Sequence, residues 1–339
     1  MKNNSIHLTA AAVAATILGG FTSAEELPQV KARQQLAVTQ GFSQSSLAVL
    51  ERASSLTQNE ISAALVGTIR PSSAHQSTFA GDTLRTEGEG WWLEVSSDGS
   101  AAEYADLAVQ ANAHSFGRPL SEQMTAAELE QRGRAFIAAH LASQIVLGPE
   151  EDLVVLRADY RTEGGQDLAT GTITRAVVAN RVVFGRTIHG VPVVGNGSQV
   201  IVTFTNDGAV ESFRYDWPAY RAVDRQSVVA PAEILTRVQT VMGVHTGVAA
   251  ATSRMAVPAR GKEYPLALTP NTQLQALDCG YYDAGFSARM AQSVQPGCTY
   301  LTVSQDAAGM RQGFSGAVPA GASFQPDAAW LETQLLSRK

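Results

Sequence analysis

Apolar and polar residues alternate along several stretches of the sequence, and this period of two is typical of β-strands with one buried face. Val200, Val202 and Phe204 fall on one side of such a stretch, and the intervening residues fall on the other. Asp-Gly steps at 98–99 and 207–208 each separate two alternating stretches, which predicts two β-hairpins. We expect further strands in residues 152–163, 170–188, 273–282 and 299–305.

Other stretches carry apolar residues at helical spacing. Thr125 and Glu128 form a capping box before the first of them, and Pro231 suits the first position of the second. The two stripes are Leu129, Gly133, Phe136, Ile137, Leu141 and Ile234, Leu235, Val238, Val241, Met242. The glycine in the first stripe leaves room for a strand to approach the helix closely.

The N-terminal quarter of the chain has weaker patterns. Thr57 and Glu60 resemble a third capping box, which predicts a short helix over residues 58–66. Residues 71–82, "PSSAHQSTFAGD", have the composition of a linker.

A weak internal repeat suggests the fold. Residues 94–104 and 203–213 align without a gap about their Asp-Gly turns, and the two helices are separated by a similar interval. We therefore predict an α+β fold of repeated units, each a helix packed across an antiparallel β-sheet. The expected organisation is a signal peptide (1–24), a polar segment that is partly helical or linker (25–82), one or more α+β units (83–225), and a C-terminal helix with a disulfide-stapled hairpin (226–339).

The first residues have the pattern of a secretory signal. Lys2 precedes an uncharged, largely apolar run over residues 8–21, and small residues lead to Ala24, after which we expect cleavage. An uncleaved N-terminal anchor is the alternative, although the run is short and interrupted by glycine. The expected location is therefore secreted or periplasmic, with no integral membrane segment after cleavage.

Charge and cysteine content narrow the possible partners. The formal net charge of −6 disfavours nucleic acid, because phosphate binding needs clustered Lys and Arg. Cys279 and Cys298 are the two cysteines, and an isolated pair in an exported protein predicts a disulfide. Two thiols without a nearby histidine do not complete a zinc site, so we expect no metal and no other cofactor.

The sequence lacks the common motifs of catalysis. None of the six histidines begins an H-E-x-x-H zinc motif. The segments "GFSGA" (313–317) and "GNGSQ" (195–199) lack the second glycine of a nucleophile elbow. "GVPVVGNG" lacks the Lys-Ser/Thr pair of a phosphate loop, and a sheet corner with positive φ at Gly190 and Gly195 explains its glycines better. We therefore expect a protein that is not an enzyme.

The stretch "RVVFGRTIHGVPVVGNGSQVIVTFTNDGAVESF" resembles the PepSY and fungalysin/thermolysin propeptide family of exported domains. The matching positions are Gly190 to Val193, Gly195, Val200 to Phe204 and Asp207 to Val210. The resemblance implies a domain that binds or restrains a peptidase, although no protease follows here. It marks no catalytic residue.

We accordingly predict an exported protein-binding or peptide-binding module, such as a peptidase inhibitor or folding helper. Binding would use surface complementarity or strand addition at a sheet edge. Consecutive Trp91 and Trp92 must point to opposite faces of a sheet, and an exposed one would anchor a partner. The predicted binding residues are Trp92, His189, Val191, Val193 and Tyr220.

Two other classes remain open. The protein could be an envelope-assembly or structural component with no peptidase target. It could also be a hydrolase with a dispersed site, for which the candidate reactive residues are Ser198, Ser315 and His189.

Overall fold

The computed structural model describes residues 42, 44–53, 57–113, 119, 123–166, 170–252, 273–285, 293–305 and 311–324. The strands of this part are β1 (Ser46–Ala53), β2 (His75–Ala80), β3 (Thr83–Gly88), β4 (Trp91–Ser96), β5 (Ala101–Asp106), β6 (Glu151–Gln166), β7 (Ile173–Ile188), β8 (Val191–Gly195), β9 (Gln199–Thr205), β10 (Val210–Asp216), β11 (Ala219–Ser227), β12 (Gln273–Asp283), β13 (Gln295–Gln305) and β14 (Arg311–Pro319). Its helices are α2 (Gln58–Ile69), α3 (Leu107–Ala113), α4 (Ala126–Phe136), the π-helical turn η3 (Ile137–Leu141) and α5 (Pro231–Thr252). None of these helices is both long and apolar enough to cross a membrane.

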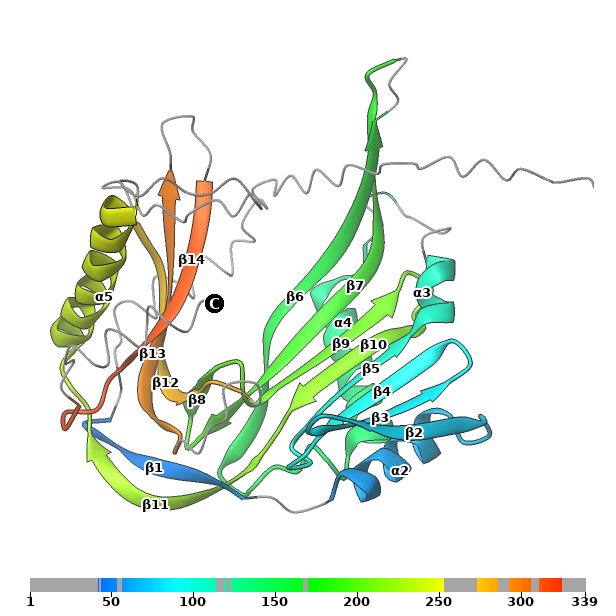
Figure 1. The fold of residues 1–339 in the computed structure, drawn as a ribbon, viewed down its shortest axis with the longest axis horizontal. Coiled ribbons are helices and arrows are strands. Elements are labelled where there is room, and N and C mark those ends of the chain that lie inside the picture. The colour runs from blue at the N-terminus through cyan, green and yellow to red at the C-terminus, as the bar shows by residue number, and fades with distance from the viewer. Residues whose placement is uncertain are drawn as a thin grey trace, which may run out of the picture.

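One mixed sheet of twelve strands dominates the described part of the chain (Figure 1). Its strand order is β14-β13-β12-β8-β7-β9-β10-β5-β4-β3-β2, with β6 on the other side of β7. The pairing of β12 with β8 is parallel, and the remaining pairings within the sheet are antiparallel. Strands β1 and β11 form a separate antiparallel pair.

The predicted α+β fold of repeated helix-on-sheet units is therefore wrong. Both expected hairpins form, as β4–β5 and β9–β10, but β5 and β10 also pair with each other. Tyr104 and Phe213 occupy equivalent positions in the aligned segments and lie directly opposite, with stacked rings 5.3 Å apart. This pairing joins the hairpins into one sheet, and α5 covers β12, β13 and β14 instead of a second copy of the first unit. Alternation identifies the two faces of a strand but not its lateral neighbours.

The largest core lies between α2, α4 and η3 and one face of the antiparallel strands. The capping boxes at Thr57 and Thr125 are both present, as predicted, although α2 continues to Ile69. A Cβ added to Gly133 would lie 2.6 Å from the ring of Phe184. This contact confirms that the glycine lets α4 approach a strand closely, and the strand is β7.

A smaller core lies under α5, where Ile234, Val238 and Val241 pack against β12, β13 and β14. Cys279 and Cys298 lie directly opposite each other on β12 and β13 and form the predicted disulfide. The third strand of this group, β14, was not expected from the sequence.

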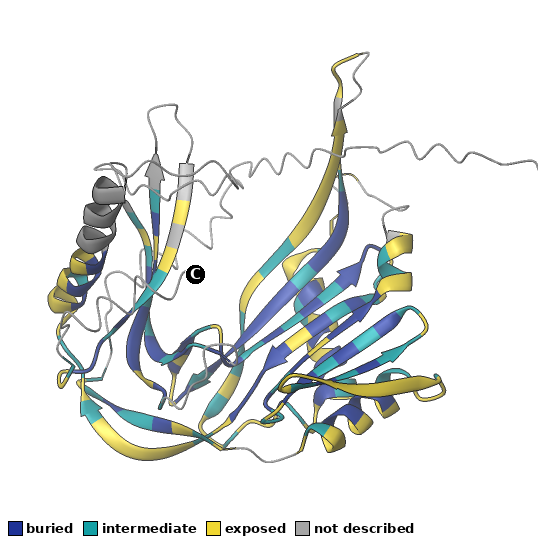
Figure 2. Cartoon of the chain, in the orientation of Figure 1, coloured by how far each residue is buried: buried dark blue, intermediate teal, exposed yellow. Residues whose placement is uncertain are grey.

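The N-terminal part contains two strands that the sequence patterns did not indicate. Strand β1 pairs with β11, and its Leu47 and Leu50 enter a third core with Tyr281. Residues 75–80, predicted as linker, form β2 and pair with β3. All six residues of β2 are exposed, so no buried face imposes an alternating pattern on this segment (Figure 2). Residues 1–24, the predicted signal peptide, lie outside the described residues.

Candidate binding surface

The antiparallel strands of the sheet have two unlike faces. Trp91, Leu93 and Val95 on β4 point into the core beneath the helices, and all three are buried. Trp92 and Glu94 therefore point to the opposite side, which we call the outer face, and both are partly exposed. Of the two adjacent tryptophans, Trp92 is the one that a partner can reach.

Trp92 lies in a cluster of charged side chains from neighbouring strands. The guanidinium of Arg85 on β3 lies over its ring, 4.9 Å from the ring centroid. Arg85 also donates to the carboxylates of Glu87 and Glu94, and these hydrogen bonds, Glu87 first, raise the pKa of Arg85. The cluster thus presents an aromatic ring held beneath a cation, with carboxylates around it.

The strand register extends this cluster into two rows that cross the outer face. The rows run perpendicular to the strands, and most of their side chains are partly or fully exposed. They are Glu87-Trp92-Ala105-Ser212-Thr203-Arg181-Asp159 and Arg85-Glu94-Glu103-Arg214-Ile201-Val183-Arg157.

Charge is distributed unevenly along these rows. The part on β3, β4 and β5 holds three carboxylates against the one cation of Arg85, whereas the part on β10, β7 and β6 holds three arginines against Asp159. Asp159 accepts two hydrogen bonds from Arg181, at 2.7 and 2.8 Å, and pairs with Arg157 at 2.8 Å. The outer face therefore has a negative end at Trp92 and a positive end at Arg214 and Arg181.

The glycine-rich corner between β8 and β9 is a buried junction. Tyr220 donates a hydrogen bond to Asp283, and the Ser198 hydroxyl lies 2.7 Å from the Tyr220 hydroxyl. Arg52 from β1 pairs with the same carboxylate, which also accepts from the Gly285 amide at 2.9 Å. Burial raises the pKa of Tyr220 to about 12. The network ties β1, β11 and β12 to the corner between β8 and β9.

The glycines of this corner have the roles expected of a sheet corner. Gly190 and Gly195 have φ of 75° and 100°, where an L side chain is strained. A Cβ on Gly195 or Gly197 would collide with Asp283, so β12 can pair with β8 only because these side chains are absent.

A second buried junction surrounds Arg186 on β7. Its guanidinium contacts two rings, 4.1 Å from the centroid of Trp217 and 4.9 Å from that of Tyr220. It donates to the Pro218 carbonyl at 2.9 Å, and Glu151 lies 3.4 Å away. Burial lowers the pKa of this arginine. Arg186 thereby fixes the start of β11 against β7, and no sequence motif marks it.

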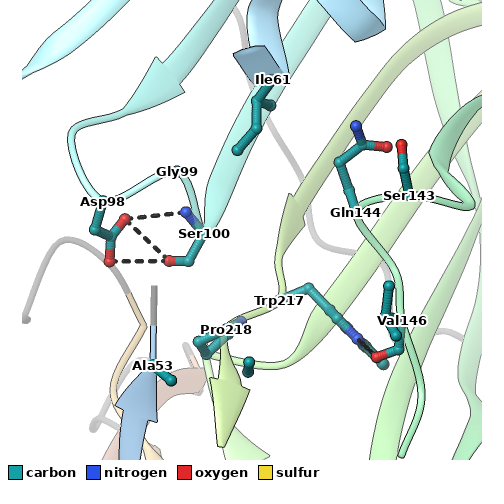
Figure 3. Close-up of a pocket in the computed structure, with 11 residues that line it drawn as sticks. Ala53, Ile61, Asp98, Gly99, Ser100, Ser143, Gln144, Val146, Trp217 and Pro218 are labelled. Carbon is teal, nitrogen blue, oxygen red and sulfur yellow. Dashed lines mark hydrogen bonds between the residues drawn. The ribbon is translucent and has the colours of Figure 1, made fainter. Parts of the chain in front are cut away.

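A small cavity lies beside this junction (Figure 3). Its volume is about 60 Å³, which accommodates a few water molecules and no peptide. Asp98 and Gln144 are among its lining residues, and Asp98 accepts hydrogen bonds from the amide and hydroxyl of Ser100. The cavity is therefore too small to be an alternative binding site for a peptide.

The structure does not bring the five predicted binding residues together. Trp92 lies on the outer face, and the other four lie at the corner around β8. His189 is exposed, with φ of 50°, and its Nδ1 lies 3.5 Å from a carboxylate oxygen of Glu150. Val191 and Val193 are buried in the core with Leu47 and Tyr281, so a partner cannot reach them without opening that core. Tyr220 is partly buried in the corner network described above.

Sequence reasoning missed the residues that surround Trp92. In residues 83–88, Leu84 and Thr86 alternate with Arg85 and Glu87, which is the signal of a strand with a polar face. If this strand is paired with the strand that carries Trp92, the charged residues Arg85, Glu87 and Glu94 are expected around Trp92. Asp283 and Arg52 could not have been found in this way, because they are far apart in the sequence.

The chain matches no protein-family model, and no curated protein matches it.

Proposed function

We propose that this chain is an exported, non-enzymatic protein that binds a protein or peptide segment on its outer face. The observation that carries the proposal is the partly exposed Trp92 beneath Arg85, on a sheet face that stays accessible in the described part of the chain. Tryptophan and arginine are the side chains that most often dominate the energy of protein interfaces. The N-terminal signal pattern and the disulfide support export, since disulfides persist in oxidising compartments.

The charge pattern indicates what kind of segment would fit. Trp92 on β4 and Arg181 on β7 are four strand steps apart, or roughly 19 Å at the usual strand spacing. An extended segment of about six residues covers that distance. Cationic side chains at the Trp92 end and anionic side chains at the Arg181 end would complement the face.

Within this function, a secreted peptidase is the partner class that the PepSY-like stretch favours, and inhibition or assisted folding is the corresponding role. Ser198 does not support the alternative of a dispersed hydrolase site. Its side chain is fully buried, and its hydroxyl forms a hydrogen bond with the Tyr220 hydroxyl. An envelope-assembly role would use the same surface with a different partner.

The test compares wild-type protein with W92A in a pull-down. The full chain, purified after export, is immobilised and exposed to the secreted and envelope proteins of its source, and bound proteins are identified by mass spectrometry. We expect a partner whose dissociation constant rises at least tenfold in W92A, because truncating a central interface tryptophan costs about 2 kcal/mol or more. The matched control is Y160A, which removes another exposed aromatic ring on β6.

Equal binding by wild type and W92A would contradict the proposed surface. A captured peptidase would lead to inhibition kinetics, whereas captured envelope components would favour the assembly role.

A further inference from the structure

Strand β2 is a free edge of the antiparallel sheet in the described part of the chain. It pairs with β3 in a regular register from His75 opposite Gly88 to Ala80 opposite Thr83, across a two-residue turn. The pair that flanks such a turn exchanges backbone hydrogen bonds, and bonded and non-bonded pairs then alternate along the hairpin. The outward-pointing N–H and C=O groups of β2 therefore belong to His75, Ser77 and Phe79.

Strand β6, which lies beside β7 and off the main strand order, differs because it carries features that protect an edge from strand addition. Leu156 is a bulge that interrupts the register between Val155 and Arg157. Charged residues follow at Arg157, Asp159, Arg161 and Glu163. Bulges and charges are the usual means of keeping another strand off an exposed edge. Strand β2, "HQSTFA", contains no Lys, Arg, Asp, Glu or Pro and has no bulge.

Phe79 gives this edge an apolar side chain that no neighbouring strand covers in the described part of the chain. It lies opposite Leu84, which is buried in the sheet, and is therefore on the helix side. Nevertheless Phe79 is 68% exposed, more than any other large hydrophobic side chain in the described part. An additional strand beside β2 would cover its ring and continue the apolar face of the sheet.

Side-chain hydrogen bonds connect β2 to the core. Ser77 hydrogen-bonds Thr86 at 2.9 Å, and Thr86 in turn hydrogen-bonds Ser62 of α2 at 2.9 Å. These bonds connect the edge to the core helix and keep Phe79 in register with Leu84.

We propose that β2 accepts an extended segment of a partner polypeptide as an added strand. The segment would place an apolar residue over Phe79 on the helix side and basic or uncharged polar residues on the outer side. The basic preference follows from the carboxylates of Glu87 and Glu94, which outnumber the Arg85 cation at this end of the outer face. The inference rests on the proposed function, because it assumes a polypeptide partner, and it adds a second contact for that partner beside the outer face.

The test uses a fluorescent ten-residue peptide that alternates leucine with lysine or threonine, and measures its binding by anisotropy. F79K places a charge on the edge. S77P removes an outward N–H that the β2–β3 ladder does not use, and with it the Ser77 hydrogen bond to Thr86. We expect each to weaken peptide binding at least tenfold. The matched control is V223K, which places the same charge on an exposed valine of another strand, β11, and should bind as wild type does.

A second peptide separates strand addition from charge attraction. It has the same sequence but carries N-methyl groups on the leucines, whose N–H groups would face β2 in the proposed arrangement, so it keeps its charge and cannot pair along the edge in this way. We expect its binding to be at least tenfold weaker than that of the unmodified peptide. Equal binding of both peptides, or wild-type binding by F79K and S77P, would overturn the proposal.

The outcomes also separate this inference from the proposed function. If W92A abolishes partner capture while F79K and S77P capture it normally, the outer-face function stands and the edge inference fails. If the wild-type protein forms a dimer in sedimentation experiments and the single substitution F79K prevents dimerisation, the edge binds a second copy of this chain. The inference is then also overturned.

Discussion

Single residues in this protein show their roles most clearly where two elements touch. Gly133 and Gly67 both lie within helices, but only Gly133 faces a strand at close range. A Cβ on Gly133 would press on Phe184 and Val182, whereas a Cβ on Gly67 would meet nothing within 4 Å. The same substitution should therefore have opposite effects at the two positions.

We expect Gly133→Ala to lower the free energy of unfolding by roughly 1–2 kcal/mol. Overpacking costs about 1–3 kcal/mol, which exceeds the gain of roughly 0.5–1 kcal/mol from replacing a helical glycine. Gly67→Ala, the control, should raise the free energy of unfolding by that smaller gain. Urea unfolding measures both, and a stabilised G133A would contradict the close approach of α4 to β7.

The buried Tyr220 hydroxyl should make stability depend on alkaline pH. Its pKa in the folded protein is raised to about 12 by burial, above the ordinary value of about 10. The folded state thus retains a proton that the unfolded chain loses above pH 10. This contribution is fully present below pH 10 and declines as the pH rises toward 12.

Y220F is the variant that isolates this effect. Its free energy of unfolding should be lower than that of wild type at pH 8, because the bonds to Asp283 and Ser198 are lost. At pH 11 the difference should shrink by about 1 kcal/mol, since one pKa unit corresponds to about 1.4 kcal/mol. An unchanged difference across this range would show that the hydroxyl does not titrate as inferred.

At the scale of elements, the disulfide joins strands that are already neighbours. Cys279 and Cys298 are 19 residues apart and oppose each other on β12 and β13. The cross-link therefore constrains the unfolded chain more than it adds contacts to the folded one. This placement makes its contribution to stability predictable from the size of the loop.

We expect the double substitution C279A/C298A to lower the free energy of unfolding by about 3 kcal/mol, the loop-entropy value for a closed loop of this size. Urea unfolding with and without a reductant provides the measurement. Reductant should destabilise the wild-type protein and leave the double variant unchanged. A wild-type protein insensitive to reductant would mean that the bridge contributes nothing to stability.

Elements also differ in how well sequence patterns indicate them. The hairpins at Asp98 and Asp207 and the helix after Thr125 were found because each has a local signature, an Asp-Gly turn or a capping box. Strand β2 was missed because an exposed edge imposes no alternation. The same exposure is the basis for proposing β2 as a site of strand addition.

At the scale of the whole molecule, lateral pairing decided the fold. Two hairpins with similar sequences could have formed two small sheets, each under its own helix. Instead Tyr104 pairs opposite Phe213 and the hairpins share one sheet, which extends through β8 to the C-terminal strands. The shared sheet creates an outer face wide enough to carry an acidic end at Trp92 and a basic end at Arg181.

The sequence by itself determined the local elements with strong signals, the disulfide pair and the opposite orientations of Trp91 and Trp92. The local elements and the tryptophan orientations depend on turns, caps and side-chain periods within a few residues. The disulfide pair follows from there being only two cysteines in the sequence. Only the tertiary structure decided which strands are neighbours, which tryptophan is exposed, and that Arg52, Tyr220 and Asp283 meet at one corner. Those contacts join residues distant in the chain, and they form because burying several apolar faces together selects one arrangement of the sheet.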